Sequence, residues 1–495
     1  MAPFTHCELS DVTPLCMPWM QANGQAVPAF SAAAAALSLE LAASAYRMDM
    51  SAWRAGGWTD ISYLTDNTLL TGPSANGGTG GGLSALMSGY YQRMARSRIR
   101  RINPVTQVLG TLRQREGSDT CKAVTMIHPA PGGRYVVAVG FMGTGKRVFD
   151  WISNFRLAHE DGMHLGFLQL TKEFERNCDK ILFPETARAL GLEQLTLQDI
   201  LLECRRADSR FHLWMAGHSQ GGAVMQLFAW RESRRGMLRQ HMTGYGFASP
   251  SVLYENPGCD LAALPLFHLI NADDMIPRVG ALLHVGRCRI FPPDERMRAV
   301  CYAPFWADPA FRAVLGLLYL NRDSGAALLF IQALLEAVQK LPGEESARVL
   351  KPLLGRFLPE RLLSALDGHI DAGIRHLIRR VQQGYALSTG HGAPPETLLA
   401  PMRIRIEEMM ARFGSRSFSI ALGRALMLPH RLVSADPAGE ASYQYIVNRC
   451  TGALRQQIWY GPAITGAAAR RPARRVSGLR SRRAVSGRRR RLGRR

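Results

Sequence analysis

The sequence lacks the features that mark membrane-spanning, exported and metal-binding proteins. No run of about 18 uncharged apolar residues occurs, so no segment is long enough to cross a bilayer as a helix. No lysine or arginine precedes Arg47, so the alanine-rich run at 32–36 lacks the basic flank of a secretory signal. The 9 cysteines are scattered, and no two are separated by two residues, which argues against a disulfide framework or a zinc knuckle. We therefore expect a soluble or peripheral protein in a reducing compartment, with the cytoplasm favoured.

Acidic residues are scarce relative to basic ones, 39 against 61, and the net charge of +22 is unevenly spread. The segment from Arg470 to Arg495 holds thirteen arginines and no acidic residue. Such a segment buries too little apolar area to offset its ordering entropy, so we predict a disordered tail over 466–495. Its arginines would bind an anionic membrane surface or nucleic acid, or remain solvated without a specific partner.

The middle of the chain has the pattern of an α/β domain. Short β-branched or aromatic runs alternate there with segments of helical periodicity, which predicts a mostly parallel sheet covered by helices. The expected strands are Tyr135 to Met142, Phe211 to Ala216, Thr243 to Phe247, Leu266 to Ile270 and His284 to Phe291. The expected helices of this part lie at 167–182, 197–206 and 222–232.

The regions on either side differ from this core. Strand signals vanish after about 305, and amphipathic patterns predict helices at 309–320, 326–341, 345–353, 359–381 and 396–413. Asp308 and Pro309 form a start signal for the first of these helices. We expect five parts: a helical and glycine-rich region that packs on the core (1–120), the core (121–304), a helical insertion or cap (305–425), the end of the core (426–465) and the tail (466–495).

The most informative motif is Gly217-His218-Ser219-Gln220-Gly221. An apolar strand enters it and a helical segment leaves it, which predicts a nucleophile elbow rather than a chance serine between glycines. The serine must occupy a strained turn, and glycine on either side lets strand and helix pass close to its backbone. Ser219 is then the candidate nucleophile, and the amide of Gln220 at the helix N-terminus is a candidate oxyanion donor.

Two further segments carry candidates for the same chemistry. The apolar run 266–270 ends near Asp273 and Asp274, which places a carboxylate at the carboxyl edge of the sheet. We select Asp274 as the acid and regard Asp273 as a cap or turn residue. The buried run 135–142 leads into Gly143 and Thr144, and the Thr144 amide is the candidate for the second oxyanion donor.

Together these motifs resemble the class 3 lipase family. The motifs that carry the resemblance are Phe141-Met142-Gly143-Thr144, Asp150-Trp151, His164-Leu165-Gly166-Phe167, Gly217 to Gly222, Gly246-Phe247-Ala248-Ser249-Pro250 and Asp274-Met275-Ile276-Pro277. The resemblance covers about 130–290. It implies an α/β-hydrolase core and hydrolysis of acyl esters without cofactor or metal. It also implies Ser219 as nucleophile, Asp274 as acid, and the amides of Thr144 and Gln220 as oxyanion hole.

The sequence departs from the family pattern at two positions. Met142 stands where the family usually has arginine, and Gln220 stands where it usually has leucine. Since an oxyanion hole of this kind uses backbone amides, neither change removes the chemistry. Met142 does remove a charge that usually anchors the loop.

The resemblance also places a lid between Thr144 and His164. The apolar side chains there are Val148, Phe149, Trp151, Ile152 and Phe155, and polar residues flank them. An interfacial lid requires such a stripe, although an ordinary amphipathic helix packed on the core has the same pattern.

The base of the triad is a histidine that follows the acid in the chain. His430 comes directly after an apolar run and a proline, which suits a loop at the sheet edge, and we select it with His369 as the alternative. The other histidines in this part are His284 on an expected strand, His376 in a helical run, and His391 in a glycine-rich loop.

These observations favour a serine hydrolase that cleaves esters of lipids or other apolar acyl groups. The helical block at 305–425 would either cap the acyl pocket or form a subdomain away from the substrate. Two other functions stay open: a membrane- or nucleic-acid-associated protein that works through its tail, and an inactive scaffold.

Overall fold

The computed structural model describes residues 9–15, 27–47, 49–65, 68–70, 121–144, 158–180, 196–319, 324–341, 345–346, 349, 370–434, 439–449 and 459–460. Three sets of predictions lie outside these residues: the lid with Phe149, Trp151 and Ile152, the alternative histidine His369, and the tail at 466–495.

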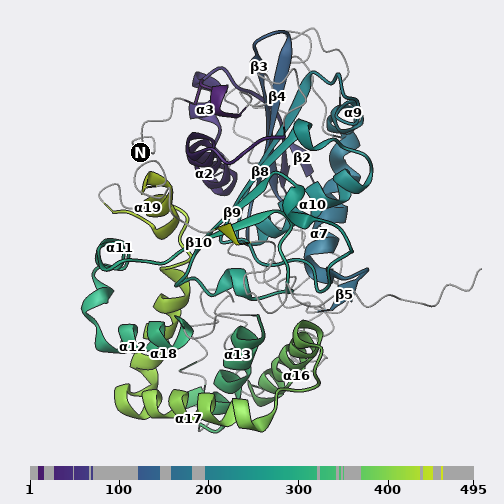
Figure 1. Cartoon of the computed structure of the whole chain (residues 1–495). Coiled ribbons are helices and arrows are strands. Elements are labelled where there is room, and N and C mark those ends of the chain that lie inside the picture. Colours follow the sequence, from purple (N-terminus) through teal and green to yellow (C-terminus); the bar gives the residue numbers. More distant parts are fainter. Residues whose placement is uncertain are drawn as a thin grey trace, which may run out of the picture.

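A nine-stranded sheet runs through the centre of the molecule, in the order β11-β10-β9-β8-β7-β4-β3-β1-β2 (Figure 1). Its central strands pair in parallel: β4 (Arg134–Phe141), β7 (Phe211–His218), β8 (Met242–Phe247), β9 (Leu266–Asn271) and β10 (Arg287–Phe291). The strands at its two edges are antiparallel: β3 (Ala123–Ala130), β1 (Thr59–Thr65) and β2 (Thr68–Leu70) on one side, and β11 (Trp459–Tyr460) on the other. The parallel centre brings the carboxyl ends of β4, β7 and β9 to one edge.

Helices cover both faces of the sheet, which explains why β7 is buried along its whole length. On one face lie α2 (Ala32–Arg47) and α19 (Ser442–Arg449); on the other lie α7 (Leu165–Asn177), α9 (Leu197–Glu203) and α10 (Gln220–Arg234). Successive side chains of β7 alternate between the two faces. Trp214 and Ala216 belong to the core on the α2 side, whereas Leu213 and Met215 belong to the core on the α10 side.

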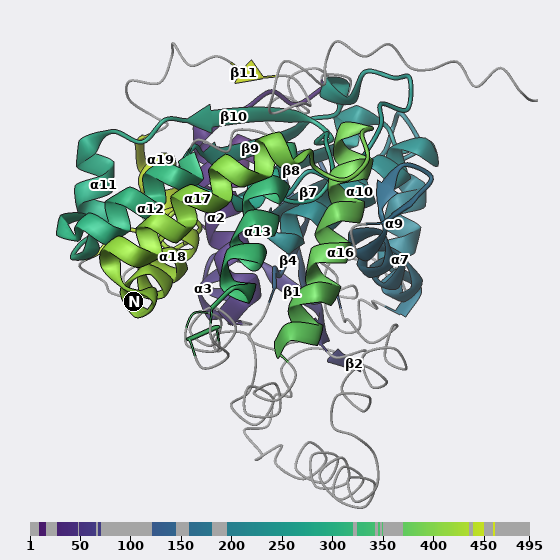
Figure 2. The same ribbon diagram turned by 90° about the horizontal axis from the view of Figure 1, so that it is seen from below.

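A block of helices lies against the lower end of the sheet and stands in front of it when viewed from below (Figures 1 and 2). Its members are α11 (Glu295–Cys301), α12 (Pro309–Tyr319), α13 (Ser324–Gln339), α16 (Ile370–Thr389), α17 (Glu396–Phe413) and α18 (Ser415–Met427). Asp308 Oδ1 accepts from the Ala310 amide at 2.9 Å, so the expected start signal of α12 is present. Phe311, Phe330 and Phe418 of this block are buried in the same core as the α2 face of the sheet.

Each of the expected strands overlaps an observed strand, but some of the expected bounds were wrong. The strand expected from His284 begins only at Arg287, so His284 precedes β10 instead of lying on it. The prediction also missed β1 and β3, and β1 means that the N-terminal region supplies strands to the sheet as well as helices. Among the described residues, no helix combines the length and apolarity that a bilayer crossing requires.

A mixed and mostly parallel sheet with helices on both faces, and a sharp turn from β7 into α10, is the architecture of an α/β-hydrolase core. The fold class that the motifs implied is confirmed.

Candidate active site

Ser219 lies in the turn between β7 and α10, with φ 57° and ψ −131°. A residue with a Cβ rarely adopts this conformation, so the surrounding structure must hold it in place. A Cβ on Gly217 would lie 2.5 Å from the Gly221 carbonyl oxygen, and a Cβ on Gly221 would lie 2.3 Å from the Phe141 oxygen. Glycine at both positions is therefore a packing requirement of the turn.

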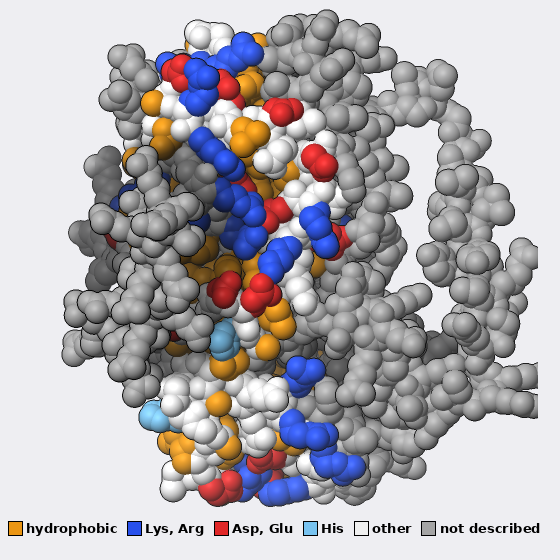
Figure 3. All heavy atoms as spheres, turned by 90° about the vertical axis from the view of Figure 1, so that its right-hand side faces the viewer, with side chains coloured by type: hydrophobic (Ala, Val, Ile, Leu, Met, Phe, Trp, Pro, Cys, Tyr) orange, Lys and Arg blue, Asp and Glu red, His pale blue; other side chains and the backbone are white. Residues whose placement is uncertain are grey.

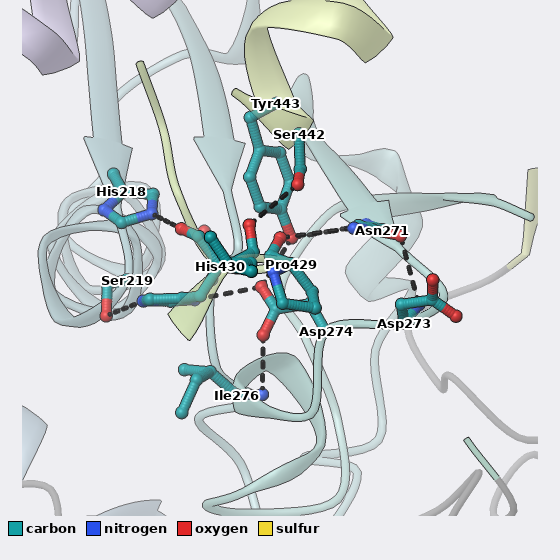
Figure 4. Close-up of polar contacts among 12 residues, drawn as sticks. His218, Ser219, Asn271, Asp273, Asp274, Ile276, Pro429, His430, Ser442 and Tyr443 are labelled. Atoms are coloured by element: carbon teal, nitrogen blue, oxygen red, sulfur yellow. Dashed lines mark hydrogen bonds and ion pairs between the residues drawn. The ribbon is translucent and has the colours of Figure 1, made fainter. Parts of the chain in front are cut away.

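Three side chains from distant segments meet at this turn (Figure 4). His430 Nε2 lies 3.0 Å from Ser219 Oγ, and His430 Nδ1 lies 2.9 Å from Asp274 Oδ2. All three residues are buried. Asp274 follows the end of β9, and His430 follows α18 of the helical block. A neutral imidazole in this arrangement donates from Nδ1 to the carboxylate and accepts from the serine hydroxyl at Nε2.

Two further donors orient the Asp274 carboxylate. The Ile276 amide donates to Oδ1 at 2.9 Å, and the Tyr443 hydroxyl donates to Oδ2 at 2.8 Å. Burial, followed by the nearby Asp274 carboxylate, raises the pKa of Tyr443 well above its ordinary value, so the phenol remains a donor. We did not identify Tyr443 as a site residue from the sequence, because no local motif links it to Asp274.

Asp273 lies in a turn after β9, as expected, and its side chain also has partners that we did not expect. Its side chain is fully buried and accepts from Arg298 Nε at 3.0 Å and from Arg298 Nη2 at 2.9 Å. The Tyr302 hydroxyl also donates to it at 3.0 Å. The sequence did not indicate this ion pair, because the pair depends on how α11, which carries Arg298, packs beside this loop. The two neighbouring aspartates thus face different partners.

His218, which belongs to the elbow, also contacts His430 and Tyr46. Its Nε2 lies 2.8 Å from the main-chain oxygen of His430, and its Nδ1 lies 2.8 Å from the Tyr46 hydroxyl. Burial, and after it the neighbouring His430, hold the pKa of His218 well below its ordinary value. Tyr46 belongs to α2, and nothing in its local sequence pointed to the site.

The two segments that carry the candidate oxyanion donors both adjoin Ser219. Gln220 is the first residue of α10, and the dipole at the start of a helix favours negative charge there. A Cβ on Gly143 would lie 3.2 Å from Ser219 Cβ and 2.4 Å from the His218 oxygen, so the loop that leads to Thr144 runs directly against the turn. The Thr144 and Gln220 amides remain predicted donors.

The other histidines that we considered lie elsewhere or have other partners. His284 is buried, with Nε2 2.8 Å from the Ser249 oxygen, and His391 is exposed in a turn after α16. Within the described ranges, no cluster of three or more histidine, cysteine, aspartate or glutamate residues has the arrangement of a metal site.

Figure 3 shows the face that carries α7, α9 and α10. Basic and acidic side chains are interspersed on its described part. Arg231 and Arg235, for example, both pair with Glu175, at 2.6 and 2.9 Å. This part of the surface therefore does not form a patch of one charge, and binding to an anionic surface remains a prediction for the tail alone.

Comparison with known proteins finds a family match within the core. Residues 138–283 match the family described as Lipase (class 3), which confirms the resemblance that the motifs predicted. Similar solved structures include the Rhizomucor miehei lipase propeptide complex, at 16% identity and a TM-score of 0.25 over 34% of this chain and 52% of that one. Another is lipase II from Rhizopus niveus, at 12% identity and a TM-score of 0.30 over 51% of this chain and 77% of that one. The chain thus spans about half of the Rhizomucor miehei chain, at 52%. No curated protein matches the chain significantly.

Proposed function

We propose that this protein, whose residues 138–283 match the class 3 lipase family, is a serine hydrolase that cleaves carboxylic esters of lipids or other apolar acyl groups. The observation that carries the proposal is the chain of contacts from Ser219 Oγ through His430 to Asp274, at 3.0 and 2.9 Å. A hydroxyl, an imidazole and a carboxylate in this order form the nucleophile, base and orienting acid of acyl transfer.

In the first half of the reaction, Ser219 Oγ attacks the ester carbonyl carbon while its proton passes to His430 Nε2. The carbonyl oxygen becomes an oxyanion that faces the amides of Gln220 and Thr144. Asp274 holds the tautomer of His430 that accepts this proton and stabilises the imidazolium. When the tetrahedral intermediate collapses, the bond to the alcohol breaks, the alcohol takes the proton from His430, and an acyl ester on Ser219 remains.

In the second half, His430 removes a proton from water, and the hydroxide attacks the acyl carbon. Collapse of this intermediate releases the carboxylic acid and returns the proton to Ser219 Oγ. The positioned base and the preorganised donors are the groups that supply the rate enhancement, and no step needs a cofactor.

The proposed substrate is apolar, and the family match supports this choice. The helical block supports it in a second way. The loop that carries His430 follows α18 directly, so the block is continuous with the site, and its apolar core joins that of the sheet. We propose that the block caps the acyl pocket.

A fluorophosphonate probe, which reacts with activated serines, tests the proposal directly. We expect wild-type protein in mild detergent to be labelled and Ser219→Ala to be unlabelled. Ser209→Ala is the matched control, because Ser209 is also buried but its hydroxyl accepts from the Phe211 amide and donates to Cys204 Sγ, with no histidine partner. An unlabelled wild type, or labelling that survives Ser219→Ala, would contradict the proposal. Turnover of p-nitrophenyl esters of increasing chain length, with and without micelles, then defines the acyl preference.

A further inference from the structure

In the turn that carries His430, the main-chain oxygens of three consecutive residues accept hydrogen bonds from other parts of the chain (Figure 4). Leu428 O accepts from Ser442 Oγ at 2.8 Å, and Pro429 O accepts from Asn271 Nδ2 at 3.2 Å. The third, His430 O, accepts from His218 Nε2 at 2.8 Å. Each donor comes from a different element, so the turn is fixed from three directions.

The third contact depends on a residue outside the family match. A carbonyl oxygen only accepts, so His218 Nε2 carries the hydrogen and Nδ1 is left with a lone pair. The Tyr46 hydroxyl, 2.8 Å away, must then donate to Nδ1. By donating to Nδ1, Tyr46 stabilises the tautomer of His218 that can hold His430 in place.

Tyr46 is itself held firmly. It lies in the last turn of α2, whose residue Ser38 accepts from Trp214 Nε1 on β7 at 2.8 Å. A Cβ on Gly143 would lie 2.1 Å from the Tyr46 hydroxyl oxygen, so this oxygen also lies against the loop that leads to Thr144. One hydroxyl thus adjoins both the loop of the proposed oxyanion hole and the histidine of the elbow.

We propose that Tyr46 is a positioning residue for the catalytic base: through His218 it fixes the main chain at His430, and so sets the approach of His430 Nε2 to Ser219 Oγ. This inference rests on the proposed function. Proton transfer requires the two atoms to remain within hydrogen-bonding distance, and a displacement of about 1 Å in an active site can cost about a hundredfold in rate.

The neutral state of His218 also matters for catalysis. The rings of His218 and His430 lie 4.6 Å apart between centroids. During the reaction His430 becomes an imidazolium, and a second positive charge at this separation would oppose its formation. Burial, and after it the neighbouring His430, hold the pKa of His218 well below its ordinary value and keep the ring uncharged. The hydrogen bond from the Tyr46 hydroxyl occupies the remaining lone pair of this neutral ring.

Tyr46→Phe tests the inference, because it removes one hydroxyl and keeps the ring. We expect kcat to fall about tenfold with KM within about twofold of wild type, and labelling of Ser219 by a fluorophosphonate to slow by the same factor, as for loss of one buried hydrogen bond. Tyr245→Phe is the matched control: its hydroxyl accepts from the Ser31 amide at 3.0 Å, just before α2, and is remote from the elbow. It should lower the melting temperature and leave kcat unchanged.

A second pair of variants keeps the test valid if Tyr46→Phe does not fold. His218→Gln retains an amide donor for His430 O, whereas His218→Phe leaves that oxygen unpaired, so Gln should retain more of kcat than Phe. Adding Tyr46→Phe to His218→Gln should lower kcat no further. The inference is overturned if kcat of Tyr46→Phe stays within twofold of wild type, if Tyr245→Phe loses as much, or if the two effects are additive. Failure of the proposed function is separate, since it would appear as an unlabelled wild type or as labelling that survives Ser219→Ala.

Discussion

The Tyr443 hydroxyl lies 2.8 Å from Asp274 Oδ2, the same oxygen that accepts from His430 Nδ1 at 2.9 Å. Tyr443 comes from α19, which follows the helical block and packs beside α2. The same hydroxyl accepts from the Asn271 amide at 3.2 Å, so it ties the carboxylate to the end of β9. The orientation of the proposed acid therefore depends on an element that lies outside the family match at 138–283.

Tyr443→Phe should lower kcat about tenfold, because a hydrogen bond to a charged acceptor contributes about 1.5–3 kcal/mol and Asp274 keeps its bond from Ile276. Steady-state kinetics on a soluble ester measures this loss. Tyr445→Phe, on the same helix, is the control and should retain wild-type kcat. If the two variants had the same kcat, Tyr443 would have no role in orienting the acid.

The two neighbouring aspartates should separate activity from stability. Asp274→Asn should lower kcat about 10⁴-fold, since an amide favours the wrong tautomer of His430, while the melting temperature changes little. Asp273→Asn should instead destabilise the fold by about 3–5 kcal/mol, because it removes the buried anionic partner of Arg298 and leaves only the exposed Glu295, at 3.6 Å. Chemical denaturation and ester turnover on both variants test this. A reversal of the two phenotypes would assign the acid to Asp273.

Glycine-to-alanine changes should have opposite effects at the elbow and in the helical block. At Gly217 the new methyl group would lie 2.5 Å from a main-chain oxygen that cannot move away, so Gly217→Ala should both destabilise the protein and abolish turnover. At Gly316, on α12, a Cβ meets nothing within 4 Å. Gly316→Ala should raise the unfolding free energy by up to about 1 kcal/mol. Thermal melts compare the two variants. If Gly217→Ala were as stable as wild type, the turn around Ser219 would not be as tightly packed as the structure shows.

Stability should fall on acidification because several histidines are buried in the neutral form. Burial lowers the pKa of His212 and His268 to about 3 and that of His284 to about 4, against about 6.5 in an unfolded chain. Above pH ~6.5 these histidines are neutral in both the folded and the unfolded protein, so they do not change the free energy of unfolding. Between pH ~6.5 and these lower values, only the unfolded state binds the protons. Each histidine then removes about 1.4 kcal/mol of unfolding free energy per pH unit.

Urea denaturation at pH 7.5 and pH 5 measures this loss. His212→Gln keeps a polar side chain beside Thr243 and removes one titrating group. Between the two pH values, this variant should therefore lose less unfolding free energy than wild type, and the difference should equal the contribution of one histidine. An identical loss would show that His212 does not titrate in the unfolding transition.

Much of the core was predictable because its signals are local. The strand that enters the elbow is apolar along its length, and the glycines around Ser219 mark a turn that no larger residue can form. The helix at 396–413 was predicted at its observed bounds from its periodicity alone. The strand β3 was missed because it contains His128 and Pro129, which weaken a strand pattern. Pairing with β4 along its whole length overrides that weak propensity.

By itself, the amino-acid sequence determined the strand, turn and helix around Ser219 and the apolar helices of the block, because hydrophobic periodicity and turn chemistry act over a few residues. It also named Asp274 and His430 as candidates, but left His369 open. Only the tertiary structure decided which imidazole lies beside Ser219, that Asp273 pairs with Arg298, and that Tyr46 and Tyr443 adjoin the site. The physical reason is that such contacts join residues as far apart as 211 positions, and their geometry is set by how whole elements pack.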